Sequence, residues 1–327
     1  MLKGIKVKLL FTGSLIILSA KVLLYILYDC FQTVKSYLIP VYKDISKDVV
    51  LITGAANGIG REMCLHFAKY CPNILALDMD VQSLKETIDI VQTETGVQIH
   101  PYKCDLRSVT EINDTVNQIL RDYGRVTILV NNAGIIHISS LLDLSLENID
   151  DCFKVNFFSH IHLIKAFLPG MLGRSTCSDD SNEDNLEPAR GHIVCISSGG
   201  SLLPISYNTV YCASKSAVLL LSESLELELQ EMGFADRIHI TSVMPYVVRT
   251  KLARHVTGSN SALFPLVEPD KCAKRIVDAV RLNKSVVYIP EAIRIRAILH
   301  ILSPNYAAAC IRNYIKRNLI FSSGKAK

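Results

Sequence analysis

The feature that most constrains the fold of this 327-residue chain is a regular alternation of short apolar runs with helical patterns. It begins with DVVLIT and a helical pattern over 58–70, followed by NILALD and a helical pattern over 81–94. The runs VQIHPYKCD, RVTILVNNAG, GHIVCISS and RIHITSV continue the series. Such alternation predicts an α/β architecture, a doubly wound parallel sheet of the Rossmann fold. Pro101 in the third run favours an edge strand, where its missing N–H does least harm.

A glycine-rich turn, LITGAANGIG, stands between the first strand and the first helix, with glycines at Gly54, Gly58 and Gly60. Side chains at these positions would keep a pyrophosphate away from the backbone N–H groups at the positive end of the helix. A glycine triplet alone is weak evidence, but its place directly after a strand and before a helix makes it specific. The turn therefore predicts a dinucleotide site.

The end of the second strand indicates which dinucleotide is bound. Asp78 stands there, eighteen residues beyond Gly60. Its carboxylate can accept hydrogen bonds from both hydroxyls of an adenosine ribose, and it would repel a 2′-phosphate. Asn57 and Met79 offer no basic partner for such a phosphate. NAD is therefore favoured over NADP, while the capping of the next helix is assigned to Asp80.

The run NTVYCASKSAV places Tyr211 and Lys215 four residues apart. In a helix both side chains would lie on one face. A nearby fixed cation lowers the pKa of a phenol, so this pair could move a proton to or from an alcohol or a carbonyl. Taken alone, the spacing is also common by chance.

Over about residues 47–290 the chain resembles the short-chain dehydrogenase/reductase family. The resemblance rests on the glycine turn, NNAG at 131–134, Ser198 thirteen residues before Tyr211, and the Tyr211/Lys215 pair, all in the family's order. It implies that Tyr211 is the acid/base and that Ser198 hydrogen-bonds the substrate oxygen. It also implies that Lys215 grips the nicotinamide ribose and lowers the pKa of Tyr211. Asn156, on a bent helix, would hold a water linked to that lysine.

The same resemblance implies a cofactor site along the carboxyl ends of the strands. Asp105 would contact the adenine, the NNAG segment would support the cofactor side of the sheet, and Thr250 would hold the nicotinamide carboxamide. Tyr246 departs from the family, which usually has glycine there, so the substrate mouth is expected to differ. The full predicted cofactor set is Gly54, Asn57, Gly58, Ile59, Gly60, Asp78, Asp105, Asn132, Ala133, Gly134, Tyr211, Lys215, Val248 and Thr250.

Charge and cysteine usage exclude several classes of function. The formal net charge of +4 is too small to indicate nucleic acid as a partner. The ten cysteines form no CxxC pair and no spacing with histidine that is typical of metal ligands. We therefore expect a reduced, cytosol-facing domain with no metal site and no disulfide framework.

The ends of the chain suggest contact with a membrane. Leu9–Tyr28 is an apolar stretch with one charge, Lys21, and is long enough to cross a bilayer. A retained anchor is preferred; a cleaved signal peptide and an interfacial helix are the alternatives. The tail is basic and apolar, and suits either a membrane surface or a helix packed on the domain. The expected organisation is an anchor at 1–35, a linker at 36–46, the main domain at 47–290 with an acidic loop at 173–190, and the tail at 291–327.

Together these features resemble the membrane-associated retinol and hydroxysteroid dehydrogenases, including the epidermal retinol dehydrogenase branch and its lipid-droplet relatives. The function expected from this resemblance is oxidation of a hydrophobic alcohol at the endoplasmic reticulum or a lipid droplet. The same residues run the reverse reduction. SLLPIS and ALFPLV are candidate pocket walls, although both could be core or lid packing. A homodimer is one option. A non-catalytic membrane scaffold is the alternative function, and a sugar-nucleotide epimerase fits the glycine spacing poorly.

Overall fold

The computed structural model describes residues 39–174, 188–254, 256–257, 266–302 and 320–321, together with 21, 23–25, 27–28 and 31. Contacts divide the chain into two compact units, Met1–Lys43 and Asp44–Lys327. Within the described residues no helix is both long enough and apolar enough to cross a bilayer. Most of the predicted anchor, the acidic loop over 175–187 and most of the tail beyond 302 lie outside the described residues.

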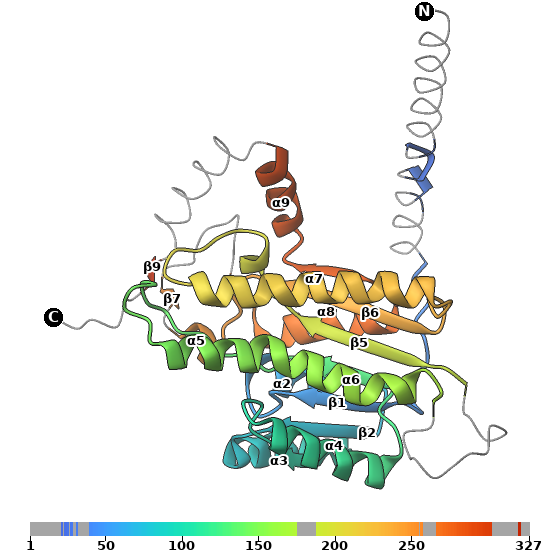
Figure 1. The fold of residues 1–327 in the computed structure, drawn as a ribbon. Coiled ribbons are helices and arrows are strands. Elements are labelled where there is room, and N and C mark those ends of the chain that lie inside the picture. The colour runs from blue at the N-terminus through green and yellow to red at the C-terminus, as the bar shows by residue number, and fades with distance from the viewer. Residues whose placement is uncertain are drawn as a thin grey trace, which may run out of the picture. The chain divides into compact units, whose positions relative to one another are not determined.

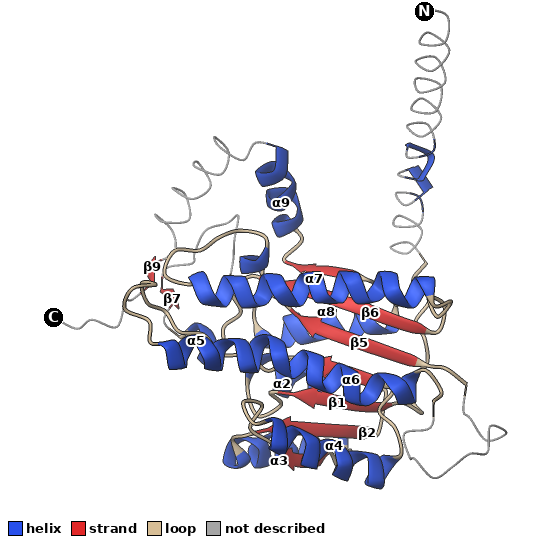
Figure 2. Cartoon of the chain, viewed as in Figure 1, coloured by secondary structure: helices blue, strands red, loops and turns tan. Residues whose placement is uncertain are grey.

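The second unit is built on a seven-stranded sheet in the order β3-β2-β1-β4-β5-β6-β8, with every neighbouring pair parallel (Figure 1, Figure 2). A separate antiparallel pair joins β7 to β9. The strands are β1 (Val49–Thr53), β2 (Asn73–Asp78), β3 (His100–Lys103), β4 (Ile128–Asn131), β5 (Gly191–Ile196), β6 (Ile238–Pro245), β7 (Val256–Thr257), β8 (Val286–Ile289) and β9 (Ile320–Phe321).

Helices cover both faces of this sheet. Side chains of α2, α3 and α8 share one half of the core, and those of α4, α6 and α7 share the other half, which faces the viewer in Figure 1. The helices are α2 (Gly58–Ala68), α3 (Val81–Thr95), α4 (Val109–Tyr123), α5 (Leu146–Phe153), α6 (Ser159–Met171), α7 (Thr209–Glu231), α8 (Pro269–Arg281) and α9 (Ala292–Leu302), with the π-helical turn η1 (Lys154–Phe158) and the 3₁₀ turns η3 (Gly199–Ser201) and η4 (Lys251–Ala253).

The predicted doubly wound parallel sheet is confirmed. The central strands are buried on both sides, which explains why they are continuous apolar runs rather than alternating ones. Pro101 does lie in β3, at the sheet edge. Asp80 is the N-cap of α3, because its Oδ1 accepts the N–H of Ser83 at 3.0 Å. Sequence reasoning missed the seventh strand, β8, a run of only four residues.

Candidate active site

The turn between β1 and α2 has the glycines that a close approach to its backbone requires. Gly54 and Gly58 have φ of +66° and +56°, a region that favours glycine. A Cβ on Gly58 would lie 2.8 Å from Cγ2 of Thr250, and one on Gly60 would collide with the carbonyl oxygen of Gly54. Asn57 begins α2 without a side-chain cap, and the first turn has no acid. The backbone N–H groups at this helix end are thus suited to an anion such as a pyrophosphate.

The NNAG segment holds the end of β4 against this turn. The hydroxyl oxygen of Thr53 accepts the backbone N–H groups of Asn132 and Ala133 at 2.9 and 3.0 Å. The side-chain amide of Asn132 donates to the carbonyl oxygen of Thr53 at 2.8 Å. On the other side of the segment, a Cβ on Gly134 would lie 3.3 Å from Nζ of Lys215. This geometry brings the glycine turn and the lysine to opposite sides of one short segment.

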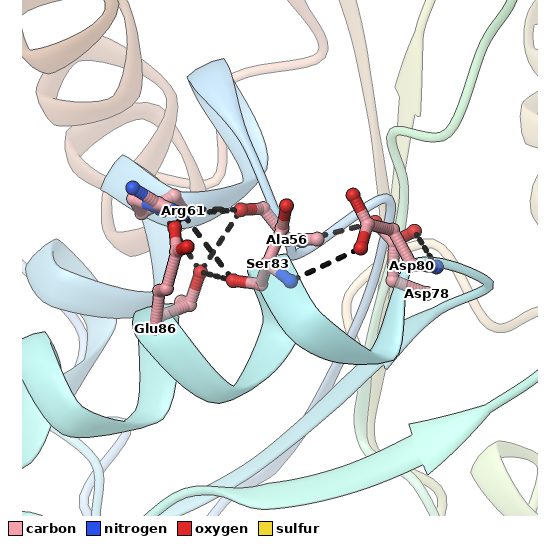
Figure 3. Close-up of polar contacts among 7 residues, drawn as sticks. Ala56, Arg61, Asp78, Asp80, Ser83 and Glu86 are labelled. Atoms are coloured by element: carbon pink, nitrogen blue, oxygen red, sulfur yellow. Dashed lines mark hydrogen bonds and ion pairs between the residues drawn. The ribbon is translucent and has the colours of Figure 1, made fainter.

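Asp78 lies at the carboxyl end of β2 and is already hydrogen-bonded to backbone (Figure 3). Its Oδ2 accepts the N–H of Ala56 at 2.9 Å, and its Oδ1 accepts the N–H of Asp80 at 3.0 Å. These contacts fix the carboxylate against the glycine turn. Each oxygen retains acceptor capacity for a ribose hydroxyl, since a carboxylate oxygen has two lone-pair sites.

Two basic residues near this carboxylate behave differently. Arg61 is directed away from it, with its guanidinium donating to the carbonyl oxygens of Ala56 and Ser83 and pairing with Glu86 at 3.1 Å (Figure 3). Lys251, on η4, lines the same cavities as Asp78. Sequence reasoning missed Lys251 because the two residues lie far apart along the chain.

Asp105 lines the second cavity, but its carboxylate is held by a neighbouring arginine. Nε and Nη2 of Arg107 donate to it at 3.0 and 2.7 Å, while Nη1 donates to Asp151 of α5 at 3.0 Å. The side-chain hydrogen bonds from Arg107 hold the pKa of Asp105 below its usual value. The predicted contact with adenine would therefore share this carboxylate with Arg107, a residue that the sequence did not single out.

Asn156 lies in the π-helical turn η1 and is fully buried. Its Oδ1 accepts the N–H of Ile135 at 2.8 Å, and its Nδ2 donates to the carbonyl oxygen of Ile135 at 3.0 Å and to Oγ of Ser214 at 3.0 Å. The irregular helix expected at this position is present, as π turns often are at functional sites.

Ser198 and Tyr211 meet across the cavity from the end of β5 and the first turn of α7. Burial raises the pKa of Tyr211 to about 12, and a hydrogen bond with the Ser198 side chain partly offsets that rise. Oγ of Ser198 also accepts the N–H of Gly200 at 3.0 Å, which fixes its position. The two hydroxyl groups are close enough to bind one substrate oxygen together.

Lys215 is buried, with its Nζ donating to the carbonyl oxygen of Ile196 at 2.8 Å. Burial lowers the pKa of Lys215 to about 8. Lys215 is not among the charges that act on Tyr211 in this structure. The expected lowering of the phenol's pKa by the lysine is therefore not seen here, because desolvation of the buried phenol dominates.

Two cavities with shared walls run along the carboxyl ends of the strands. One has a volume of about 360 Å³ and the other of about 470 Å³, and both touch Gly54, Asp78, Ala133 and Gly134. Asp105 lines only the second cavity, while Gly60 and Asn156 line neither. The predicted site residues that the first cavity brings together are Gly54, Asn57, Gly58, Ile59, Asp78, Asn132, Ala133, Gly134, Ser198, Tyr211, Lys215, Val248 and Thr250.

Comparison with known proteins identifies the family. Residues 48–260 match the family model described as short chain dehydrogenase. The chain is 29% identical over 276 residues to epidermal retinol dehydrogenase 2 of Mus musculus, covering 84% of each protein. It is 32% identical over 277 residues to 17-beta-hydroxysteroid dehydrogenase 13 of Mus musculus, again covering 84% of each. A solved short-chain dehydrogenase/reductase from Burkholderia phymatum in complex with NAD has a similar fold, with a TM-score of 0.68 at 23% identity, covering 80% of this chain and 95% of that one.

The glycine cradle, the strand-end cavities and the grouping of Ser198, Tyr211 and Lys215 fit a dinucleotide-dependent redox site. Together with the match over most of the described domain, they lead to one conclusion. The chain belongs to the short-chain dehydrogenase/reductase family and is an NAD(P)-dependent oxidoreductase acting on CH–OH groups.

Proposed function

We propose that the protein interconverts a hydrophobic secondary or allylic alcohol, such as a retinol, a steroid or another lipid-like alcohol, and its carbonyl. The observation that carries this proposal is the first cavity, in which Ser198, Tyr211 and Lys215 lie beside apolar walls. Ile136 and Ile205 are among those walls. A few convergent polar groups in an apolar cavity are typical of a small-molecule site. The names of the relatives, a retinol and a hydroxysteroid dehydrogenase, agree with such a substrate.

Three polar residues of the cavity, together with the buried Asn156, have roles in the proposed reaction. Bound NAD(P) supplies the hydride acceptor or donor. Tyr211 exchanges a proton with the substrate oxygen, and Ser198 orients that oxygen by a hydrogen bond. Lys215 holds the nicotinamide ribose, and Asn156 links the lysine to solvent water. With its pKa raised to about 12, the phenol is protonated at neutral pH and can donate its proton to a carbonyl oxygen in the reduction. In the oxidation Tyr211 must first lose this proton before it accepts the proton of the alcohol.

We propose NAD as the preferred cofactor. Asp78 is fixed by two backbone N–H groups at the place where an adenosine ribose would lie. A 2′-phosphate would meet this carboxylate at close range. Lys251 lines the same cavities and offers such a phosphate some compensation. The preference for NAD should therefore be measurable but limited.

We also propose that the protein works at a membrane or lipid-droplet surface, as one dehydrogenase domain over 47–290 with an anchor at 1–35, a linker at 36–46 and a basic tail at 291–327. The composition of Leu9–Tyr28 supports the anchor. On α9, which begins the tail, Ile295 and Ile298 are exposed beside the exposed Arg294. Exposed apolar residues next to a cation suit an anionic lipid surface. The catalytic domain would face the cytosol.

The test is a turnover screen of retinoids, steroids and fatty alcohols with NAD⁺ and NADP⁺ side by side. In Tyr211→Phe we expect turnover of the best substrate to fall by about 10²–10⁴-fold while dinucleotide binding persists. Tyr207→Phe is the matched control, since Tyr207 is an exposed residue just before α7 and this variant should keep full activity. A scaffold, the alternative function, would have no turnover to lose. Equal activity in the wild type and Tyr211→Phe would refute the proposal.

A further inference from the structure

Asn208 has a side-chain carbonyl oxygen, Oδ1, that is buried and has no hydrogen-bond partner among the residues that the structure describes. The residue is 2% exposed and lines the first cavity together with Ser198 and Tyr211. Buried polar groups are almost always satisfied, so an unpaired amide in the wall of a ligand cavity calls for a partner from the ligand.

The ordinary structural role of such an asparagine is not fulfilled here. Asn208 is the N-cap of α7, where asparagine usually accepts an N–H of the first helical turn. Its side chain makes no capping bond. The N-caps of three other α-helices in the same domain do so: Asp80, Ser108 and Ser145. The amide of Asn208 therefore remains available for another partner.

The backbone before Asn208 is held in a conformation that L-residues rarely adopt. Tyr207 has φ of +63°, and its carbonyl oxygen accepts the N–H of Ser139 at 3.0 Å. Left-handed backbone at a non-glycine residue is unfavourable and is concentrated at functional sites. This turn places Asn208 at the start of α7, in the wall of the cavity.

We propose that Asn208 hydrogen-bonds a second oxygen of the substrate, close to the reacting carbon. This inference rests on the proposed function. Asn208, Ser198 and Tyr211 line the same cavity, which has a volume of about 360 Å³. The ligand oxygen bound by the amide is therefore proposed to belong to a carbon next to, or one removed from, the reacting one.

The chemistry of the cavity narrows the substrate class. Ile136, Ile138 and Ile205 line the same cavity as the amide and give it apolar walls. A substrate with a single oxygen would reach Tyr211 and Ser198 but leave the amide of Asn208 desolvated and unpaired. A hydrophobic vicinal diol or α-hydroxy ketone can form hydrogen bonds with all three side chains, Tyr211, Ser198 and Asn208. Sites built to bind a substrate hydroxyl discriminate strongly against analogues that lack it.

The experiment compares octane-2,3-diol with octan-2-ol as substrates for the full-length wild type, Asn208→Leu and Ile138→Val. We expect the wild type to prefer the diol in kcat/KM. Asn208→Leu should lose about 10- to 100-fold on the diol and little on the mono-alcohol. Ile138→Val trims the apolar wall and should change both substrates alike. Because Oδ1 of Asn208 has no partner among the described residues, Asn208→Leu should keep or raise the midpoint of thermal unfolding.

Equal losses on both substrates, or a lowered unfolding midpoint in Asn208→Leu, would overturn the inference and make Asn208 a structural residue. Absence of a diol preference in the wild type would do the same. These outcomes leave the proposed function intact as long as Tyr211→Phe remains inactive. A wild type that oxidises neither alcohol, nor any compound in the wider screen, refutes the proposed function itself and this inference with it.

Discussion

Removal of the buried ammonium of Lys215 should change how the stability of the protein depends on pH. Burial lowers the pKa of this lysine from its usual 10.5 to about 8. At about 1.4 kcal/mol for each tenfold change, keeping the lysine charged in the folded protein costs about 3 kcal/mol at neutral pH. Lys215→Met removes this cost. It also leaves the carbonyl oxygen of Ile196 without its donor at 2.8 Å, which costs about 1–3 kcal/mol.

The sign of the pH effect follows from proton binding. Below pH 8 the lysine is protonated both folded and unfolded, so the wild type bears the full cost. Between about pH 8 and pH 10.5 the unfolded chain binds a proton that the folded protein does not, so wild-type stability rises with pH. The free energy of unfolding of the wild type, relative to Lys215→Met, should therefore rise by about 3 kcal/mol across this range. At neutral pH the variant should be about as stable as the wild type or more so.

Urea titrations of the full-length protein at a series of pH values from neutral to about 10.5 measure this difference directly. Lys165→Met is the matched control, since Lys165 is exposed on α6 and its loss should give a pH-independent difference. Ionising groups that do not feel the charge of Lys215 are common to all three proteins and cancel in the comparison, whereas His160, Cys152 and Cys195 each have a pKa that this charge lowers. Parallel pH curves for the wild type and Lys215→Met would refute the claim that Lys215 is a desolvated cation.

Three further substitutions test the cofactor site. Asp78→Asn should raise the ratio of kcat/KM with NADP to kcat/KM with NAD by about tenfold or more, because it removes a full negative charge from the ribose position. Lys251→Ala should lower the same ratio. Initial-rate measurements that show unchanged ratios would contradict the assignment. Gly60→Ala should destabilise the fold by about 1–3 kcal/mol and weaken NADH binding, because its Cβ would strike the Gly54 carbonyl oxygen, and a variant with wild-type NADH fluorescence titrations and unfolding midpoint would contradict this reading.

Local patterns in the sequence were sufficient to predict most of the fold. The alternation of apolar runs and helical patterns sets the parallel sheet, and the positions of Pro101 and Asp80 were predicted correctly because each depends only on nearby backbone. β8 was missed for a physical reason. β8 has only four residues, so it is not part of a long apolar run that the sequence would show, and Val286 is exposed. Its pairing with β6 therefore depends on the completed sheet.

The residues of the candidate site also fall into those that a local sequence pattern predicts and those that only the folded chain brings together. Tyr211 and Lys215 are one helical turn apart, so spacing predicted a shared helix face, and the other motifs of the family were needed to predict a shared site. The approach of Lys251 to Asp78 and the bridge from Arg107 to Asp151 join segments far apart in the chain, and no local pattern indicates them. The raised pKa of Tyr211 was not predicted, because burial is a property of the packed domain rather than of the pair.

The π-helical turn η1 has a consequence for the evolution of this chain. α5, η1 and α6 follow one another without interruption, so the wider turn changes the rotational phase of everything after it, by about 100° for one extra residue. Leu163 and Phe167 face the sheet only in that phase. Deleting one residue within η1 would therefore turn α6 away from its own core as well as displacing Asn156. The number of residues in this turn therefore determines both the packing of α6 and the position of the Asn156 amide. A change in that number would alter both, so the two features are expected to evolve together.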